Sequence, residues 1–323
     1  MDAEVILDRR RLRRKTTFWR IIAFVLGIVA LLATLAAVSG GSLIPKRDHV
    51  ARITVDGFIA TRPEAADLIR KASKSSSVKA IVLRINSPGG AASGGELLYR
   101  SVVEAGEKKP IVAVIDGLGT SAAYMTALGA DHIVARESAI TGSIGVIFQF
   151  GHFETLLEKI GAKYEEVKSA PLKGQPSPFG EPSQAALNML QDVVDDTYKW
   201  FVGLVVQHRG IAEAKAFDLA DGSIFTGRQA FEEKLVDELG GEQQALVWLN
   251  ENHEIPEDLP VTDWKRRDRV FGTLPSSAVA GLARFLGLGP EAYPAIETVV
   301  PKRLTVDGLL SVWQASDVVG PSR

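Results

Sequence analysis

A serine stands where an apolar segment gives way to a run of small residues. Ser121 lies in Gly119-Thr-Ser-Ala-Ala-Tyr124, directly after the apolar segment Pro110–Asp116. The pattern predicts a strand followed by a helix that begins at Ser121. At that point the hydroxyl meets unpaired backbone N–H groups and the positive end of the helix dipole. Ser121 is therefore a candidate nucleophile for acyl transfer.

A glycine turn ends an earlier apolar segment, in Ile85-Asn-Ser-Pro-Gly-Gly90. Glycine lets a backbone approach closely and adopt a positive φ, and amide N–H groups can hold an oxyanion without any side chain. We expect Gly89, Gly90 and the amide of Ala122 to stabilise a tetrahedral intermediate on Ser121. Taken alone, Pro-Gly-Gly more often marks an ordinary turn; its position directly after an apolar segment favours the functional interpretation.

A serine nucleophile needs a base within about 3 Å. The chain has five histidines, and only His152, on a loop after a predicted strand, has a plausible path to Ser121. His132 would lie about 16 Å along the helix axis from the serine if that helix persisted. The remaining histidines lie beside the N-terminal linker, at the end of a long helix and in the irregular tail: His49, His208 and His253.

A lysine is the other candidate base, provided that desolvation or a nearby cation frees its amine from the usual protonated form. Lys173 lies in a loop rich in proline and glycine without an adjacent carboxylate, whereas Lys168 follows two glutamates. An exposed, solvated lysine is the ordinary interpretation of such a loop. Residue chemistry alone leaves His152 and Lys173 both open.

A third motif, Thr141-Gly-Ser-Ile-Gly145, lacks the spacing and the lysine of a phosphate-binding P-loop. We expect it to enter a strand beside the substrate groove. Its serine, Ser143, would contact substrate or Lys173, and a purely structural turn is the alternative.

Composition excludes several classes of function. The net charge of −2 gives no general attraction to nucleic acid. The absence of cysteine rules out disulfides, thiolate metal sites and cysteine nucleophiles. The serine chemistry above requires no metal and no other cofactor.

The N-terminus predicts a membrane anchor. Residues 1–20 carry a cluster of arginines and would be cytoplasmic, and 21–38 are uncharged. Eighteen helical residues span about 27 Å, close to the hydrocarbon thickness of a bilayer. After a linker at 39–48, the rest of the chain would lie outside the cytoplasm under the positive-inside rule. A cleaved signal peptide is the alternative.

Strands that alternate with helices predict an α/β fold with a mainly parallel sheet. We place the catalytic domain at 49–250 and a C-terminal extension, which we assign to contacts between protomers, at 251–323. The extension contains two candidate helices, 276–286 and 304–315. The predicted strands are 49–58, 78–85, 110–116, 132–135, 144–148 and 164–168, and the predicted helices start near 61, 94, 121, 153 and 183.

Taken together, the Pro-Gly-Gly, Gly-Thr-Ser-Ala, Thr-Gly-Ser-Ile-Gly and Lys168–Lys173 motifs resemble the short form of bacterial signal peptide peptidase A. That serine peptidase family has a Clp-protease/crotonase-like fold, and the resemblance runs from about His49 to Gly240. It implies that Ser121 is the nucleophile, that Lys173 rather than His152 is the general base, and that the Gly90 and Ala122 amides hold the oxyanion. The family often has two glycines after the nucleophile, where this chain has two alanines, so substrate preference could differ.

The resemblance also implies a homo-oligomer on the outer face of the inner (cell) membrane that degrades left-over signal peptides and other short apolar peptides. Activity would then be highest on the alkaline side of neutral. Three alternatives remain: a Clp-like Ser121/His152 protease, a non-catalytic membrane-anchored peptide-binding scaffold, and an acyl-CoA enzyme of the crotonase class.

Overall fold

The computed structural model describes residues 15–25, 27–28, 47–265 and 310–312. The chain divides into two compact units, Met1–Arg47 and Asp48–Arg323. The elements of the second unit, in chain order, are β1 (His49–Asp56), α2 (Glu64–Lys74), β2 (Val78–Ser87), β3 (Gly89–Ala91), α3 (Ala92–Gly106), β4 (Ile111–Thr120), α4 (Ala122–Ala127), β5 (His132–Ala135), β6 (Ile140–Gly142), α5 (Glu154–Lys159), α6 (Gln184–Arg209), α7 (Glu213–Leu219), β7 (Ile224–Thr226), α8 (Gly227–Glu232), β8 (Glu238–Leu239), α9 (Glu242–His253), β9 (Val261–Asp263) and β10 (Leu310–Val312).

The first unit is described at residues 15–25 and 27–28, which are helical, and at Arg47. Most of the predicted anchor, namely residue 26 and residues 29–38, lies outside the described residues. Within the described residues, no helix is both long enough and apolar enough to cross a membrane.

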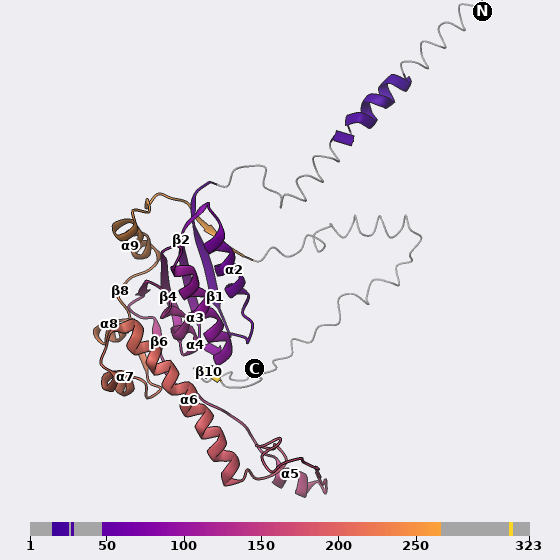
Figure 1. Ribbon diagram of the computed structural model, residues 1–323, viewed down its shortest axis with the longest axis vertical. Coiled ribbons are helices and arrows are strands. Elements are labelled where there is room, and N and C mark those ends of the chain that lie inside the picture. The colour runs from indigo at the N-terminus through magenta and orange to yellow at the C-terminus, as the bar shows by residue number, and fades with distance from the viewer. Residues whose placement is uncertain (1–14, 26, 29–46, 266–309, 313–323) are drawn as a thin grey trace, which may run out of the picture. The chain divides into compact units, whose positions relative to one another are not determined.

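A central sheet organises the second unit (Figure 1). Its strands run in the order β7-β6-β4-β2-β1-β9, and β5 pairs with both β4 and β8. Every pairing in this sheet is parallel except that of β6 with β7. The mixed α/β architecture with a mainly parallel sheet, predicted from the alternation of strands and helices, is confirmed. β9 lies beyond residue 250, so the start of the C-terminal extension contributes an edge strand.

Both faces of this sheet are covered, which explains why its central strands are almost wholly apolar. Side chains alternate between the faces along each strand. In β2, Ile81, Leu83 and Ile85 join the larger core, which includes residues of α2, α3, α4 and α6. Ala80 and Val82 of the same strand point to the opposite face and pack with Ala245 and Leu249 of α9.

The long helix α6 is packed along only part of its length. Ser183 caps it by accepting a hydrogen bond from the Ala186 amide, and Gly210 ends it in the left-handed conformation. Apart from Ala186, the buried residues of α6 all lie between Phe201 and Val205. The C-terminal half therefore joins the core, while α5 lies near the other end of the helix (Figure 1). We call residues 150–183, which include α5 and lead into α6, the α5 arm.

Three predicted elements are wrong where the structure describes them. The strand of the Thr-Gly-Ser motif is β6, at Ile140–Gly142, and not 144–148, because the β6 backbone pairs with the end of β4. Residues 164–168 form no strand, because they lie on the exposed arm and pair with no neighbouring strand. Residues 310–312, predicted within a helix, form strand β10 because they pair with β3. The predicted helix at 276–286 lies outside the described residues.

Candidate active site

Ser121 is the residue at which β4 becomes α4. Its backbone has φ 59° and ψ −122°, an uncommon conformation for a residue other than glycine. The Ser121 amide donates to the Gly142 carbonyl at 2.8 Å, and the Ser121 carbonyl accepts from the Met125 amide at 2.8 Å. Ser121 is 1% exposed. Such backbone strain in a sharp strand-to-helix turn persists only where its surroundings enforce it, and it is often found at catalytic residues.

Strand β6 holds this turn from one side. Thr141 Oγ1 donates to the Gly119 carbonyl at 2.7 Å, and Gly142 is paired with Thr120. Ser143 follows with φ 48°, and its amide donates to the Ser223 carbonyl at 2.7 Å. The predicted site residue Ser143 is thus next in sequence to the backbone partner of Ser121, and it is almost fully buried.

The Pro-Gly-Gly turn lies on the other side of β4. Ser87, at the end of β2, is paired with Gly119, and its hydroxyl accepts a hydrogen bond from the Gly89 amide at 3.1 Å. The structure therefore brings the ends of β2, β4 and β6 together, and with them Gly89, Ser121 and Ser143.

Gly90 lies against the loop that follows β1. The Ile59 amide donates to the Gly89 carbonyl at 2.9 Å, and the Ala91 amide donates to the Ile59 carbonyl at 2.8 Å. A Cβ on Gly90 would lie 2.2 Å from the Ile59 carbonyl oxygen, so only glycine fits there. Because backbone groups alternate in direction along a strand, the Gly90 N–H points away from Ile59.

Helix α4 is fixed in the core by small residues. A Cβ on Gly95 of α3 would lie 2.8 Å from the Ala122 Cβ, so the Ala122 methyl group packs toward α3. The Tyr124 hydroxyl donates to the Leu235 carbonyl at 2.8 Å, and burial raises the pKa of this phenol. The alanines after Ser121 therefore serve helix packing, and their effect on substrate preference stays a prediction.

We call the central sheet together with the helices that pack against it the body, and Ser121 belongs to it. Neither candidate base lies in this body. His152 and Lys173 are both exposed residues of the α5 arm. Within this arm, the Phe153 amide donates to the Pro178 carbonyl at 2.7 Å, and the ring centroids of Tyr164 and Phe179 lie 4.4 Å apart. Lys168 pairs with Glu166. Among the described residues, no hydrogen bond or ion pair involves the Lys173 side chain.

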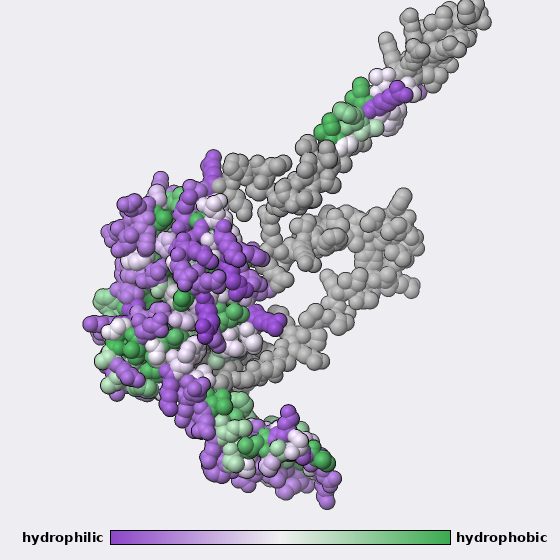
Figure 2. Space-filling model, viewed as in Figure 1, coloured by the Kyte–Doolittle hydropathy of each residue, from purple (hydrophilic) through white to green (hydrophobic). Residues whose placement is uncertain are grey.

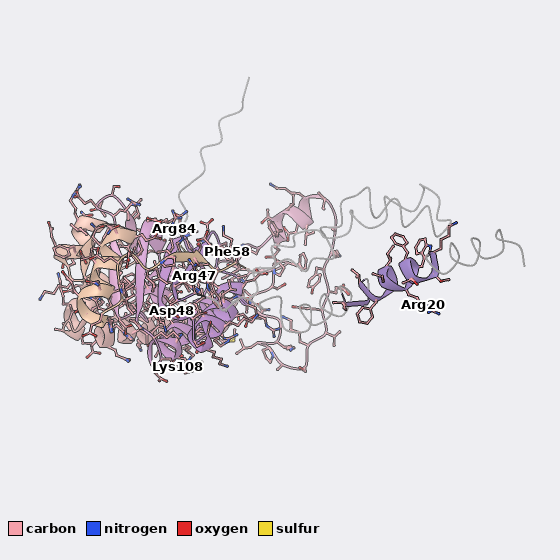
Figure 3. The ribbon with its side chains drawn as sticks, turned by 90° about the horizontal axis from the view of Figure 1, so that it is seen from above. Arg20, Arg47, Asp48, Phe58, Arg84 and Lys108 are labelled. Atoms are coloured by element: carbon pink, nitrogen blue, oxygen red, sulfur yellow. The ribbon has the colours of Figure 1, made fainter. Side chains whose placement is uncertain are left out.

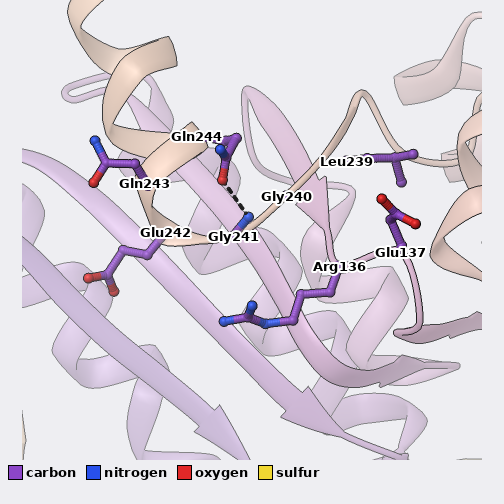
Figure 4. Close-up of a pocket in the computed structure, with 8 residues that line it drawn as sticks. All are labelled: Arg136, Glu137, Leu239, Gly240, Gly241, Glu242, Gln243 and Gln244. Atoms are coloured by element: carbon purple, nitrogen blue, oxygen red, sulfur yellow. Dashed lines mark hydrogen bonds between the residues drawn. The ribbon is translucent and has the colours of Figure 1, made fainter.

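A separate pocket of about 470 Å³ lies where β8 leads into α9 (Figure 4). Its lining carries charges of both signs, from Arg136, Glu137 and Glu242, and includes none of the predicted site residues. The Gly241 amide at the start of α9 donates to Gln244 Oε1 at 2.9 Å. This pocket does not belong to the Ser121 site.

Two backbone partners of the site were not predicted from the sequence. Gly142 was part of a noted motif, but its carbonyl was not assigned to Ser121. The contact of Ile59 with Gly90 could not be predicted from the sequence, because it is a single long-range bridge that leaves no residue pattern. Strand β10, which pairs with β3 beside the site, lies where the sequence predicts a helix.

Comparison with known proteins defines the class. Residues 104–256 match the model of peptidase family S49. The chain is 40% identical over 205 residues to a putative protease of Synechocystis, covering 62% of this chain and 73% of the relative. It is 34% identical over 244 residues to a putative signal peptide peptidase SppA of Enterococcus faecium, covering 69% of each. A chloroplastic serine protease SPPA of Arabidopsis thaliana is 30% identical over 67% of this chain and 34% of its own length.

These similarities make the protein a serine peptidase. It belongs to peptidase family S49, and specifically to the signal peptide peptidase A group, as its four motifs predicted.

Proposed function

We propose that this protein is a membrane-anchored serine endopeptidase in which Ser121 and Lys173 form a catalytic dyad within a Clp-protease-like fold. The observation that carries the proposal is the backbone of Ser121, held at φ 59° where three strand ends meet. Ser143 also has a positive φ, of 48°, but Ser121 lies at the turn from β4 into α4, and family membership supports assigning the nucleophile to it.

The proposed reaction passes through one acyl-enzyme intermediate, an ester on Ser121. The neutral amine of Lys173 accepts the Ser121 hydroxyl proton as Oγ bonds to the peptide carbonyl carbon, and the amides of Gly90 and Ala122 hold the oxyanion. The C–N bond then breaks, and the lysine gives its proton to the leaving amine. Water hydrolyses the ester and restores the Ser121 hydroxyl, so no cofactor is consumed.

We infer that the dyad forms between two copies of the chain. A base must approach the serine to about 3 Å, whereas the Lys173 side chain is exposed on the α5 arm and makes no hydrogen bond or ion pair among the described residues. Exposed apolar side chains on or beside this arm support an association with a second copy (Figure 2): Ile147, Phe150, Phe153, Leu156, Ile160, Tyr164, Val167, Leu172 and Phe179.

The proposed substrates are signal peptide remnants and other short apolar peptides. The similarity to the putative signal peptide peptidase SppA of Enterococcus faecium supports this substrate class. The apolar run at 21–38, behind a cluster of arginines, supports a single-pass anchor in the cell membrane. The N-terminus would then be cytoplasmic and the catalytic domain outside the cytoplasm.

A fluorophosphonate probe tests the proposal, because it labels activated serines. Wild-type protein should be labelled, and Ser121→Ala should not. Lys173→Ala should slow labelling and peptide hydrolysis by at least about a thousandfold, because the general base of the proposed dyad is lost. His152→Ala should leave both rates close to wild type.

The controls separate the alternatives. Loss of activity in His152→Ala with full activity in Lys173→Ala would favour the Ser/His enzyme. Equal labelling of wild type and Ser121→Ala would remove Ser121 as nucleophile and favour the scaffold. Circular dichroism and oligomeric state should match wild type in all three variants, so that folding does not explain a loss.

A further inference from the structure

A segment from near the C-terminus lies on the strand that carries the proposed oxyanion glycine. β10 pairs antiparallel with β3, with Leu310 opposite Ala91, Ser311 opposite Gly90 and Val312 opposite Gly89. These two strands form a small sheet of their own, separate from the central one. More than two hundred positions separate the two partners along the sequence, so the pairing is not a local turn.

The pairing uses the side of β3 that substrate would need. The Gly89 carbonyl and the Ala91 amide are both hydrogen-bonded to Ile59. Since successive residues of a strand direct their backbone groups to opposite sides, the N–H and C=O of Gly90 face the other side. Ser311 lies opposite Gly90 on that side. The amide proposed to hold the oxyanion therefore faces the backbone of β10.

An extended peptide that adds to a sheet edge binds mainly through main-chain hydrogen bonds. A substrate peptide whose carbonyl reaches the Gly90 amide must run along this edge, where β10 already lies. The sequence around β10, Leu309-Leu-Ser-Val-Trp313, is uncharged and mostly apolar. It therefore has the chemistry of the proposed substrates.

We propose that β10 is a built-in competitor that occupies the peptide-binding edge of β3 and must leave before an extended peptide substrate can bind. This inference rests on the proposed function for its consequence, the control of peptide hydrolysis. The docking itself concerns the β3 edge and requires no catalysis.

Binding of a synthetic peptide tests the docking without any chemistry. The probe is a fluorescein-labelled peptide with the sequence of residues 306–316. It is titrated into Ser121→Ala protein ending either at Asp307, without β10, or at Ser316, with β10. The shorter chain should bind the peptide, and the longer chain should bind it about tenfold more weakly, because only the undocked fraction can accept it. Equal affinities, or no binding to the shorter chain, would overturn the proposal.

A point variant in the full chain covers the case in which the truncated chain does not fold. Ser311→Pro removes the backbone N–H opposite Gly90 and breaks the ladder. It should raise the affinity of Ser121→Ala protein for the labelled peptide, while its thermal midpoint stays near that of the parent. An unchanged affinity would contradict the docking of β10.

A second measurement, of the steady-state kinetics of peptide hydrolysis, tests whether β10 competes with substrate in the chain that keeps Ser121. Removal of residues 308–323 should lower the KM for a short apolar peptide about tenfold and leave kcat unchanged, because a competitor is removed from free enzyme. If no serine labelling occurs in any variant, the proposed function fails while the binding result still stands. If labelling is normal but neither KM nor peptide affinity changes, the competitor is disproved and the peptidase stands.

Discussion

At the scale of single residues, the site is built from backbone more than from side chains. Ser121 is held by a carbonyl of β6 and an amide of α4, and Gly90 is held through its neighbours by Ile59. The path of the backbone therefore requires glycine at positions 89 and 90 and a positive φ at Ser121. Such positions tolerate substitution poorly even when the new side chain is small.

Gly90→Ala is expected to cost both stability and activity. The new methyl group would collide with the Ile59 carbonyl oxygen at 2.2 Å. Overpacking of this kind lowers the free energy of unfolding by about 1–3 kcal/mol, and a shifted Gly90 amide would no longer meet the oxyanion. Chemical denaturation and peptide hydrolysis would measure the two effects.

The matched control is Gly203→Ala, at an exposed position in the C-terminal half of α6, where a Cβ meets nothing within 4 Å. Alanine favours a helix interior over glycine by about 1 kcal/mol, so this variant should be as stable as wild type or more so, with normal activity. If Gly90→Ala behaved like Gly203→Ala, the close approach to Ile59 would have no importance.

The meeting of the strand ends at the candidate site could be predicted from the sequence better than the position of a base. Ser121, the glycine turn and the Ser143 motif each follow an apolar segment, and the carboxyl ends of neighbouring parallel strands meet at one edge. That logic places Gly89, Ser121 and Ser143 together correctly. The position of a base depends on an exposed arm and on a second chain in our proposal, and no residue pattern encodes either.

At the scale of elements, the connection between α8 and β8 joins α6 to the sheet through one charged residue. Arg209, the last residue of α6, donates to both carboxylate oxygens of Asp237 at 2.6 and 3.0 Å and to the Lys234 carbonyl at 2.7 Å. Asp237 also accepts from the Ile133 amide of β5 at 2.8 Å. The same connection between α8 and β8 receives the Tyr124 hydroxyl of α4. This loop therefore links α4, α6 and β5.

Arg209→Leu should lower the free energy of unfolding by about 3 kcal/mol, because it leaves the Asp237 carboxylate without its buried partner. The Arg209 side chain is 9% exposed. In the control Arg228→Leu, the ion pair with Glu137 has side chains that are 61% and 65% exposed. Its loss should cost no more than about 1 kcal/mol. Urea denaturation of both variants would decide, and equal losses would contradict the role given to Arg209.

Elements with their own hydrophobic period were predicted well, and elements defined by a distant partner were not. The core strands β2, β4 and β5 and the capped helix α6 carry local signals of apolar runs and end residues. β6 and β10 have three residues each, too few for a period, and they exist through pairing with β4 and β3. The segment 164–168, which is predicted as a strand, has no alternating pattern and lies on the exposed arm.

At the scale of the whole molecule, the body and the α5 arm contrast in what they expose. The body buries its apolar side chains on both faces of the sheet, and few large ones, such as Phe58 near Gly90, stay exposed (Figure 3). On the arm, no residue of α5 is fully buried, and Leu156 is 56% exposed. Apolar surface of this kind marks an interaction site in a soluble domain.

Complementation between two inactive variants tests whether a neighbouring copy supplies the base. Ser121→Ala keeps Lys173, and Lys173→Ala keeps Ser121. If each site takes its serine from one copy and its lysine from the next, random mixing in a closed head-to-tail assembly leaves about a quarter of the sites intact. Co-expression of the two variants should then restore about that fraction of wild-type peptide hydrolysis, although each variant alone is inactive. If both groups come from the same chain, every site in the mixture lacks one of them and no activity returns. A double variant, Ser121→Ala with Lys173→Ala, co-expressed with wild type controls for simple dilution, and size-exclusion chromatography with light scattering verifies that mixed assemblies form.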